Sequence, residues 1–160
     1  YKADTTVDRE TIEEILKAAQ QAPTWKNSQT GRYYVVTDEE KLKEIKENCL
    51  LSRNGINAEN APVLIVTTFV KDWSGFEKNG SPTNEAGNLW GAYDLGLQNQ
   101  NLMMKASDLG LDTLVMGVRD EMATRNALEI PSNEIIALGC RDIEPAAPKR
   151  RELDVIAKFI

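Results

Sequence analysis

The sequence predicts an α+β fold, in which helices pack against a sheet formed by the same chain. Three observations predict it, and two of them are patterns: apolar residues recur at helical spacing in some segments, and other segments are rich in aromatic and β-branched residues. The third is length, because 160 residues of which 41% are hydrophobic can fill one core but hardly two. We therefore expect residues 1–160 to form a single domain.

The first half of the chain is expected to contain two helices and two strands. Asp8 can cap a first helix that Pro23 ends, and the apolar positions at helical spacing within it are Ile12, Ile15, Leu16 and Ala19. Residues 32–37 read RYYVVT, which is typical of a strand, and Asp38 follows as the cap of a short charged helix. Residues 62–70 are apolar at successive positions, which predicts a strand covered on both faces near the centre of the sheet.

The middle of the chain combines an irregular segment with a long helix. Residues 71–87 mix Gly, Ser, Pro and aromatic residues without periodicity, as expected of a lid or a binding loop. A helix is expected over about residues 85–108, with Gly110 as its stop. Gly91 and Gly96 each cost about 1 kcal/mol of helix propensity relative to Ala. Close approach of another backbone at a helix–helix contact would explain them, and a kink is the alternative.

The last part of the chain is expected to alternate strand, helix and strand. Residues 112–118 predict a short strand that ends at Gly117, residues 119–128 a short helix before Pro131, and residues 134–140 a last strand. Repeats and low-complexity runs are absent, so no linker and no second domain are expected.

Composition excludes several classes of function. The formal net charge is −6, and the sequence contains no basic run of the kind that binds phosphate backbones. Nucleic acid is therefore not an expected partner. No segment is apolar over the roughly 20 residues that a bilayer crossing needs, and we expect a soluble, cytoplasmic protein without a membrane partner. Cys49 and Cys140 have no C-x-x-C spacing, which fits a reducing compartment and two buried thiols.

The sequence also contains no histidine. This removes most zinc sites, the Ser/His and Cys/His nucleophile systems, and the commonest general base near neutral pH. We therefore expect chemistry carried by an organic cofactor, for which the protein supplies binding and orientation, or no catalysis.

A polar loop joins the first helix to the first strand. Its residues Asn27, Ser28 and Gln29 can form a turn in which their side chains satisfy nearby backbone groups, or they can hold a planar polar ligand between two rigid elements. Taken alone, the loop favours the turn.

The order of several motifs resembles the FMN-dependent nitroreductase family over essentially the whole chain. These motifs are APTWKNSQ at residues 22–29, QNLMMKASDLGL at residues 100–111 and LGCRDIEPAAPKRREL at residues 138–153. The resemblance implies a mixed, mainly antiparallel sheet flanked by helices, with a long central helix at a homodimer interface.

The resemblance also implies which residues contact the flavin. It places Pro23, Thr24, Trp25 and Asn27 beside the flavin of the partner subunit, with Gln29 supporting the loop. The edge of an isoalloxazine ring presents alternating donors and acceptors, which amide side chains can match. Thr30 stands where the family commonly has proline.

Four further positions match family sites near the phosphate and the ring. Lys149 and Arg151 correspond to the C-terminal Lys-x-Arg that grips the flavin phosphate, through charge-assisted bonds to a dianion. Met116 and Gly117 fall at a strand end whose backbone amides approach the flavin, and many related enzymes have an acidic residue in place of Met116. No side chain of the protein is expected to be catalytic, because the cofactor carries the hydride chemistry.

Family members usually begin with an Arg-Arg-Ser-x-Arg motif that binds the phosphate and the flavin ring. Tyr1 and Lys2 resemble the residues that follow this motif, which is not among the 160 residues. Either the sequence is trimmed or its cofactor site is depleted, and the intact first helix favours trimming.

The function implied is transfer of hydride from NADH or NADPH through FMN to a nitroaromatic, a quinone or a similar small acceptor, with ping-pong kinetics. The alternative is a flavin-binding or interaction module without NAD(P)H turnover. Flavin destruction and reductive dehalogenation remain open on the same fold.

Overall fold

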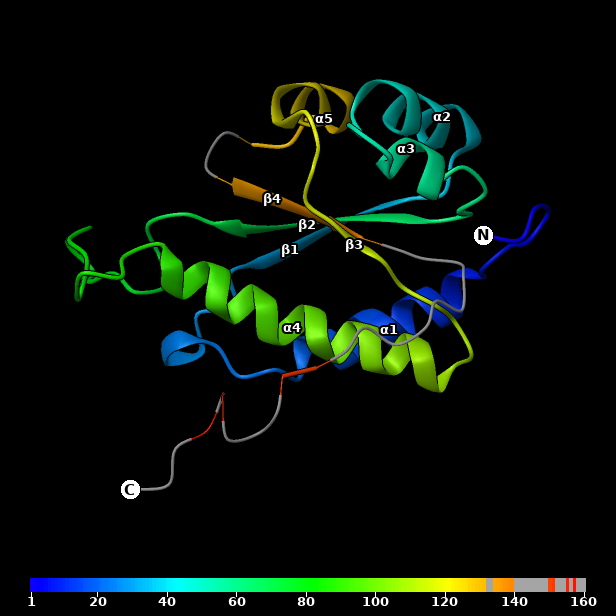
Figure 1. The fold of residues 1–160 in the computed structure, drawn as a ribbon. Coiled ribbons are helices and arrows are strands. Elements are labelled where there is room, and N and C mark those ends of the chain that lie inside the picture. The colour runs from blue at the N-terminus through cyan, green and yellow to red at the C-terminus, as the bar shows by residue number, and fades with distance from the viewer. Residues whose placement is uncertain (132–133, 140–149, 152–154, 156, 158–160) are drawn as a thin grey trace.

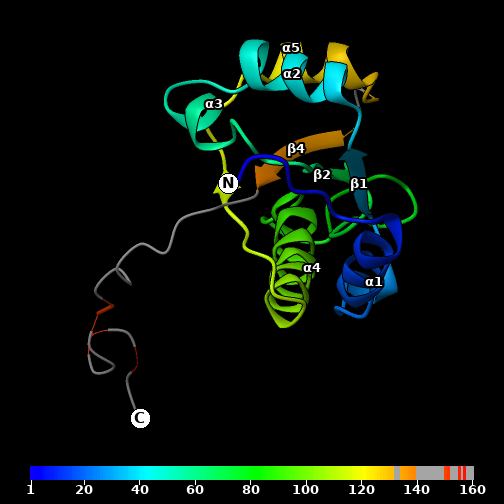
Figure 2. The same ribbon diagram turned by 90° about the vertical axis from the view of Figure 1, so that its right-hand side faces the viewer.

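The computed structural model is built from three layers, with one sheet between two groups of helices (Figures 1 and 2). It describes residues 1–131, 134–139, 150–151, 155 and 157, and for 134–139 the backbone alone. The helical elements of this part of the chain are α1 (Arg9–Gln20), the 3-10 turn η1 (Trp25–Asn27), α2 (Glu39–Asn48), α3 (Asn54–Asn57), α4 (Leu89–Asp108) and α5 (Glu121–Leu128). None of these helices is long and apolar enough to cross a bilayer.

The sheet has four strands in the order β1-β2-β4-β3, and each neighbouring pair is antiparallel. The strands are β1 (Gly31–Val36), β2 (Leu64–Val70), β3 (Val115–Met116) and β4 (Glu134–Gly139). The predicted α+β architecture is confirmed, and β2 is a central strand as expected. β3 is shorter than the predicted strand at 112–118 and ends one residue before Gly117.

Three helices begin where an Asp side chain accepts a hydrogen bond from the first turn. Asp8 accepts from the backbone N–H of Thr11, and Asp38 accepts from that of Lys41. Each carboxylate satisfies a donor that has no partner inside the helix and is favourable at the positive end of the helix dipole. Asp120 caps α5 in the same way. The predicted starts of the first two helices are thereby confirmed.

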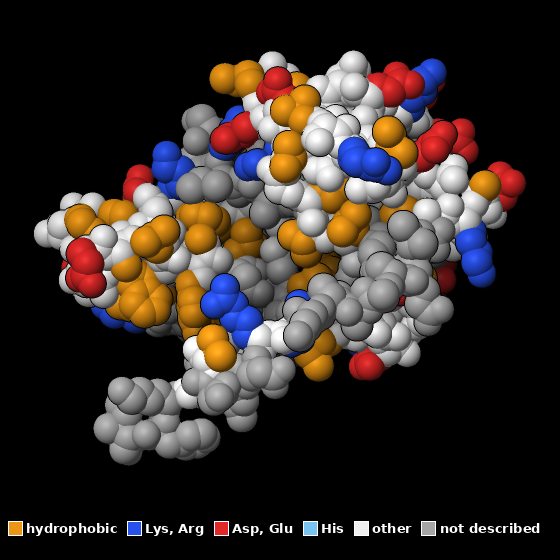
Figure 3. Space-filling view, viewed as in Figure 1, with side chains coloured by type: hydrophobic (Ala, Val, Ile, Leu, Met, Phe, Trp, Pro, Cys, Tyr) orange, Lys and Arg blue, Asp and Glu red, His pale blue; other side chains and the backbone are white. Residues whose placement is uncertain are grey.

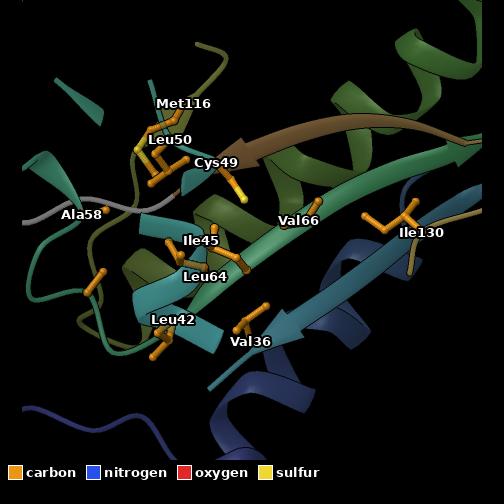
Figure 4. Close-up of a cluster of buried hydrophobic side chains, with 11 residues drawn as sticks. Val36, Leu42, Ile45, Cys49, Leu50, Ala58, Leu64, Val66, Met116 and Ile130 are labelled. Carbon is orange, nitrogen blue, oxygen red and sulfur yellow. The ribbon is translucent and has the colours of Figure 1, made fainter. Parts of the chain in front are cut away.

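The core lies on both faces of the sheet, because successive side chains of β2 point to opposite sides. Leu64 and Val66 belong to a cluster that lies under α2, α3 and α5. Figure 4 shows the buried residues of this cluster. Ile65 belongs to a second cluster formed with α1 and α4. Cys49 lies in the first cluster and is buried as predicted, whereas Cys140 is outside the described residues.

The long helix begins at Leu89, about four residues later than predicted. The residues before it form turns, in which Asn84 Oδ1 accepts hydrogen bonds from the backbone N–H of Ala86 (3.1 Å) and from the indole N–H of Trp90 (3.0 Å). These hydrogen bonds of Asn84 compete with helix formation, as those of short polar side chains commonly do. Gly110, with φ of +76°, follows the helix as predicted.

The two glycines of α4 have different environments, which corrects the expectation that one helix–helix contact explains both. A Cβ on Gly91 would lie 2.4 Å from the ring of Phe69. The absence of a side chain at Gly91 therefore makes room for Phe69 of β2, and this contact is not one with a second helix. A Cβ on Gly96 would have no heavy atom of the described residues within 4 Å, and Gly96 is exposed. Of the two, Gly96 alone remains available for a contact with another molecule.

We expect Gly91→Ala to lower the free energy of unfolding by about 1–3 kcal/mol, because the added methyl overpacks a buried ring. Denaturant unfolding monitored by circular dichroism measures the change. Phe69→Leu removes part of the ring, so in a Gly91→Ala background it should cost less than it costs alone. Strictly additive effects of the two substitutions would contradict this contact.

Candidate functional site

The polar loop forms a tight turn with an uncommon backbone. Lys26, Asn27 and Gln29 have φ values of 46°, 57° and 49°, in the left-handed region that non-glycine residues seldom adopt. Such residues cluster where the surrounding structure holds them in place, often at binding sites. The turn is therefore a defined shape and a candidate for function.

Three backbone N–H groups of the turn are satisfied by nearby residues. The N–H of Asn27 donates to the carbonyl of Thr24 (3.0 Å), and the N–H of Ser28 donates to the carbonyl of Trp25 (2.8 Å). Gln29 donates its N–H to Thr24 Oγ1 at 3.1 Å. The turn thus uses a threonine hydroxyl and main-chain carbonyls, and it needs neither amide side chain.

The amide side chains of Asn27 and Gln29 are consequently free to meet a ligand. Both residues are exposed, and neither amide group forms a hydrogen bond with the part of the chain that the structure describes. A turn stabilised by its own Asn and Gln would show such bonds. The structure therefore does not support the simple turn interpretation, and it leaves amide donors and acceptors exposed on a fixed backbone.

Asp94 is a buried residue that belongs to none of the sequence motifs described above. Its Oδ2 accepts hydrogen bonds from Ser74 Oγ (2.6 Å), from the N–H of Trp25 (2.9 Å) and from Ser28 Oγ (3.4 Å). The residue is 3% exposed and lies on the buried side of α4. A carboxylate among the apolar positions of a helix was the available signal, because a buried charge needs partners.

Aromatic rings pack beside the turn. The ring centroids of Trp25 and Trp90 are 4.5 Å apart, and Tyr93 meets Trp90 edge-on at 6.0 Å. The ammonium group of Lys26 lies 5.6 Å from the Trp25 ring centroid. Trp25 is half-buried, and its indole N–H is buried without a partner among the described residues. The Trp25 ring thus connects the turn to Trp90 of α4.

The segment 71–87, predicted as a lid or binding loop, folds back on itself. Thr83 donates its N–H to the carbonyl of Gly75 at 2.8 Å, and Phe76 and Pro82 form an isolated bridge. Glu77 pairs with Lys26 at 3.4 Å. A hydrogen bond from the Thr83 hydroxyl and the charge of Lys26 lower the pKa of the Glu77 carboxyl. The segment is thus connected to the turn.

The other predicted site residues have simpler surroundings. Pro23 is exposed at the start of the turn, and Gly117 is exposed, with space free of described atoms where a Cβ would lie. Met116 is 2% exposed and packs in the core, so its side chain faces away from solvent. Arg151 is exposed, and Lys149 lies outside the described residues.

The structure does not bring all of these residues together within one chain. The turn precedes β1 and Gly117 follows β3, and these two strands form opposite edges of the sheet (Figure 1). Three inter-strand spacings separate these edges, which amounts to about 14 Å. A ligand that contacts both groups through one chain would have to reach across the sheet.

A cavity of about 320 Å³ lies apart from the turn. It is bounded by the N-terminal segment, α1 and the C-terminal half of α4, with Tyr1, Ile15 and Leu102 in its wall. None of the predicted site residues that the structure describes lines it. The turn is therefore the stronger candidate site.

Comparisons with known proteins point to one family. The sequence profile described as the nitroreductase family matches residues 1–59 and 51–140. A protein of Archaeoglobus fulgidus, provisionally named an NADH dehydrogenase/NAD(P)H nitroreductase, is 30% identical over 138 residues, which are 84% of this chain and 72% of that protein.

Two further relatives agree. An NADPH-dependent oxidoreductase of Staphylococcus haemolyticus is 26% identical over 161 residues, which cover 92% of this chain and 63% of that protein. The chain thus spans less than two thirds of that relative. The solved structure of an FMN-dependent nitroreductase from Clostridium difficile is 25% identical, with a TM-score of 0.75 over 100% of this chain and 91% of that one.

Proposed function

This chain belongs to the nitroreductase family, and from that premise we propose that it transfers hydride from NADH or NADPH through bound FMN to a small acceptor such as a nitroaromatic or a quinone. The names of the relatives support the flavin and the nicotinamide donor. One observation in the structure carries the proposal. The amides of Asn27 and Gln29 are exposed, and the described residues leave them unused on a backbone that other groups hold in place.

The residues present fit a flavin. FMN supplies the hydride-accepting and hydride-donating chemistry when bound. Asn27 and Gln29 offer donors and acceptors to the ring edge, and the exposed backbone at Gly117 allows close approach to the ring. Lys149 and Arg151 are proposed to bind the phosphate. This division of roles needs no histidine, because the protein binds and orients while the cofactor reacts.

We also propose that two copies of the chain form each flavin site. The separation of the turn from Gly117 supports this, since a second copy can bring its turn to the β3 edge of the first. The outer face of α4 supports it too: Leu89, Tyr93 and Met104 are 70%, 60% and 60% exposed. With Gly96 they follow helical spacing, and Figure 3 shows hydrophobic side chains gathered over this side of the molecule.

Titration of the protein with FMN tests the proposed function. Binding should shift the visible absorbance of the flavin when protein and FMN are both at micromolar concentration. The FMN-loaded protein should also oxidise NADH or NADPH. Absence of any spectral shift would reject flavin binding. A shift without oxidation of either nicotinamide would instead indicate a flavin-binding module without turnover.

We expect ping-pong kinetics, because the nicotinamide and the acceptor must use the same flavin face in turn. The donor then leaves before the acceptor enters, and double-reciprocal plots at several acceptor concentrations run parallel. High concentrations of either substrate should inhibit competitively against the other. Intersecting lines would mean that both substrates occupy the site together, which contradicts a shared face.

A further inference from the structure

We propose that Asp94 is a positioning residue that fixes the turn over residues 24–29 in the shape that presents its amides to the flavin ring. The inference rests on the proposed function and adds a residue that contacts no ligand itself. Its basis is one buried carboxylate oxygen, which bonds to two segments that are distant in sequence.

The bonds to Asp94 act on the turn at both ends of η1. The N–H of Trp25 at its first residue and the hydroxyl of Ser28 just after it both donate to Oδ2, at 2.9 and 3.4 Å. Between these two points lie Lys26 and Asn27, which have positive φ. Left-handed residues persist only where their surroundings stabilise them. Asp94 supplies that stabilisation from a helix, which is a rigid support.

The segment 71–87 takes part in the same arrangement. Ser74 is 1% exposed and donates the shortest of the three bonds, 2.6 Å, to Asp94. Glu77 adds an ion pair to Lys26 on the outer side of the turn. The segment therefore buttresses the turn from a second side, which assigns it a supporting role in place of the predicted lid.

Substitution of Asp94 should release the turn without dismantling the fold. Within the described part of the chain, the two core clusters include neither Asp94 nor the residues bonded to it. Loss of one charge-assisted bond corresponds to about tenfold or more in an equilibrium constant. We expect Asp94→Ala to weaken FMN and riboflavin by the same factor, of about tenfold, because the turn faces the ring shared by both ligands.

Tryptic cleavage of the flavin-free protein gives a readout that does not depend on the cofactor. Lys26 lies in the turn with an exposed side chain, and proteases cut where backbone is released. Asp94→Ala should accelerate cleavage after Lys26 at least severalfold, while cleavage after Lys41 in α2 stays at the wild-type rate. Mass spectrometry of the fragments identifies each site.

Asp38→Ala is the matched control, because it also removes a carboxylate that accepts a backbone N–H, at 2.9 Å, but far from the turn. It should lower thermal stability without altering flavin affinity or cleavage after Lys26. Asp94→Asn keeps an acceptor oxygen and should restore much of the affinity. If Asp94→Ala fails to fold, Ser74→Ala removes one donor to Asp94. Because Ser74 lies outside the turn and acts on it only through Asp94, it is expected to weaken both flavins less, by about threefold.

Two results would overturn the inference. One is wild-type flavin affinity and wild-type cleavage after Lys26 in Asp94→Ala, or in Ser74→Ala if the former does not fold. The other is a loss of FMN affinity that spares riboflavin, since this would assign the effect to the phosphate. Wild-type protein that binds no flavin would reject the proposed function instead, and accelerated cleavage would still show that Asp94 holds the turn.

Discussion

Gly96→Arg is expected to convert a dimer into monomers and to release FMN from the same protein. The position lies in the middle of the exposed apolar face of α4, between Tyr93 and Met104. A guanidinium there would be buried unpaired against the second copy, which costs several kcal/mol. If each flavin contacts both chains, cofactor retention must fall together with association.

The environment of Gly96 makes this a clean test. The described residues leave open space around its missing Cβ, so the substitution should leave the fold of each chain intact, as far-ultraviolet circular dichroism would show. Asn48→Arg, at the exposed end of α2 on the opposite face of the sheet, adds the same side chain and charge and should change neither property. Sedimentation gives the mass, and filtration followed by absorbance gives bound FMN. A change in only one of the two would refute the shared interface.

The elements of the fold were predictable wherever the signal is local. Asp8 and Asp38 start their helices as expected, because a cap involves only the next few residues. The sequence pattern predicts the start of the long helix about four residues too early, since hydrogen bonds of Asn84 to later residues compete with helix formation there. The sequence does not distinguish the roles of Gly91 and Gly96. The contact of Gly91 with Phe69 joins residues that are distant in sequence, so no local pattern indicates it.

The candidate site was predictable only in part. The turn and its amides could be found from a resemblance that spans the chain, and the described residues do leave Asn27 and Gln29 unengaged. The bonds of Asp94 to Trp25 and Ser74 join residues 69 and 20 positions apart, which no local pattern encodes. Whether the amides contact flavin stays a prediction for the titration to test.

Replacement of both Lys149 and Arg151 by Ala is expected to weaken FMN at least about tenfold and riboflavin little. Only FMN carries a phosphate dianion, and each charged hydrogen bond to it contributes about 1.5–3 kcal/mol. Arg151 and Arg150 are both exposed, which makes Arg150→Ala the control.

The control separates specific binding from the general attraction of a basic tail. Arg150→Ala should change the dissociation constants of both ligands little, whereas Arg151→Ala alone should weaken FMN selectively. Raising the ionic strength should reduce the preference for FMN over riboflavin, since salt screens charges that are not buried. Fluorescence quenching of each flavin on titration gives the constants needed. Equal losses of FMN and riboflavin in the double variant would show that the two cations act by folding the tail, and the phosphate would then have to be bound by other groups.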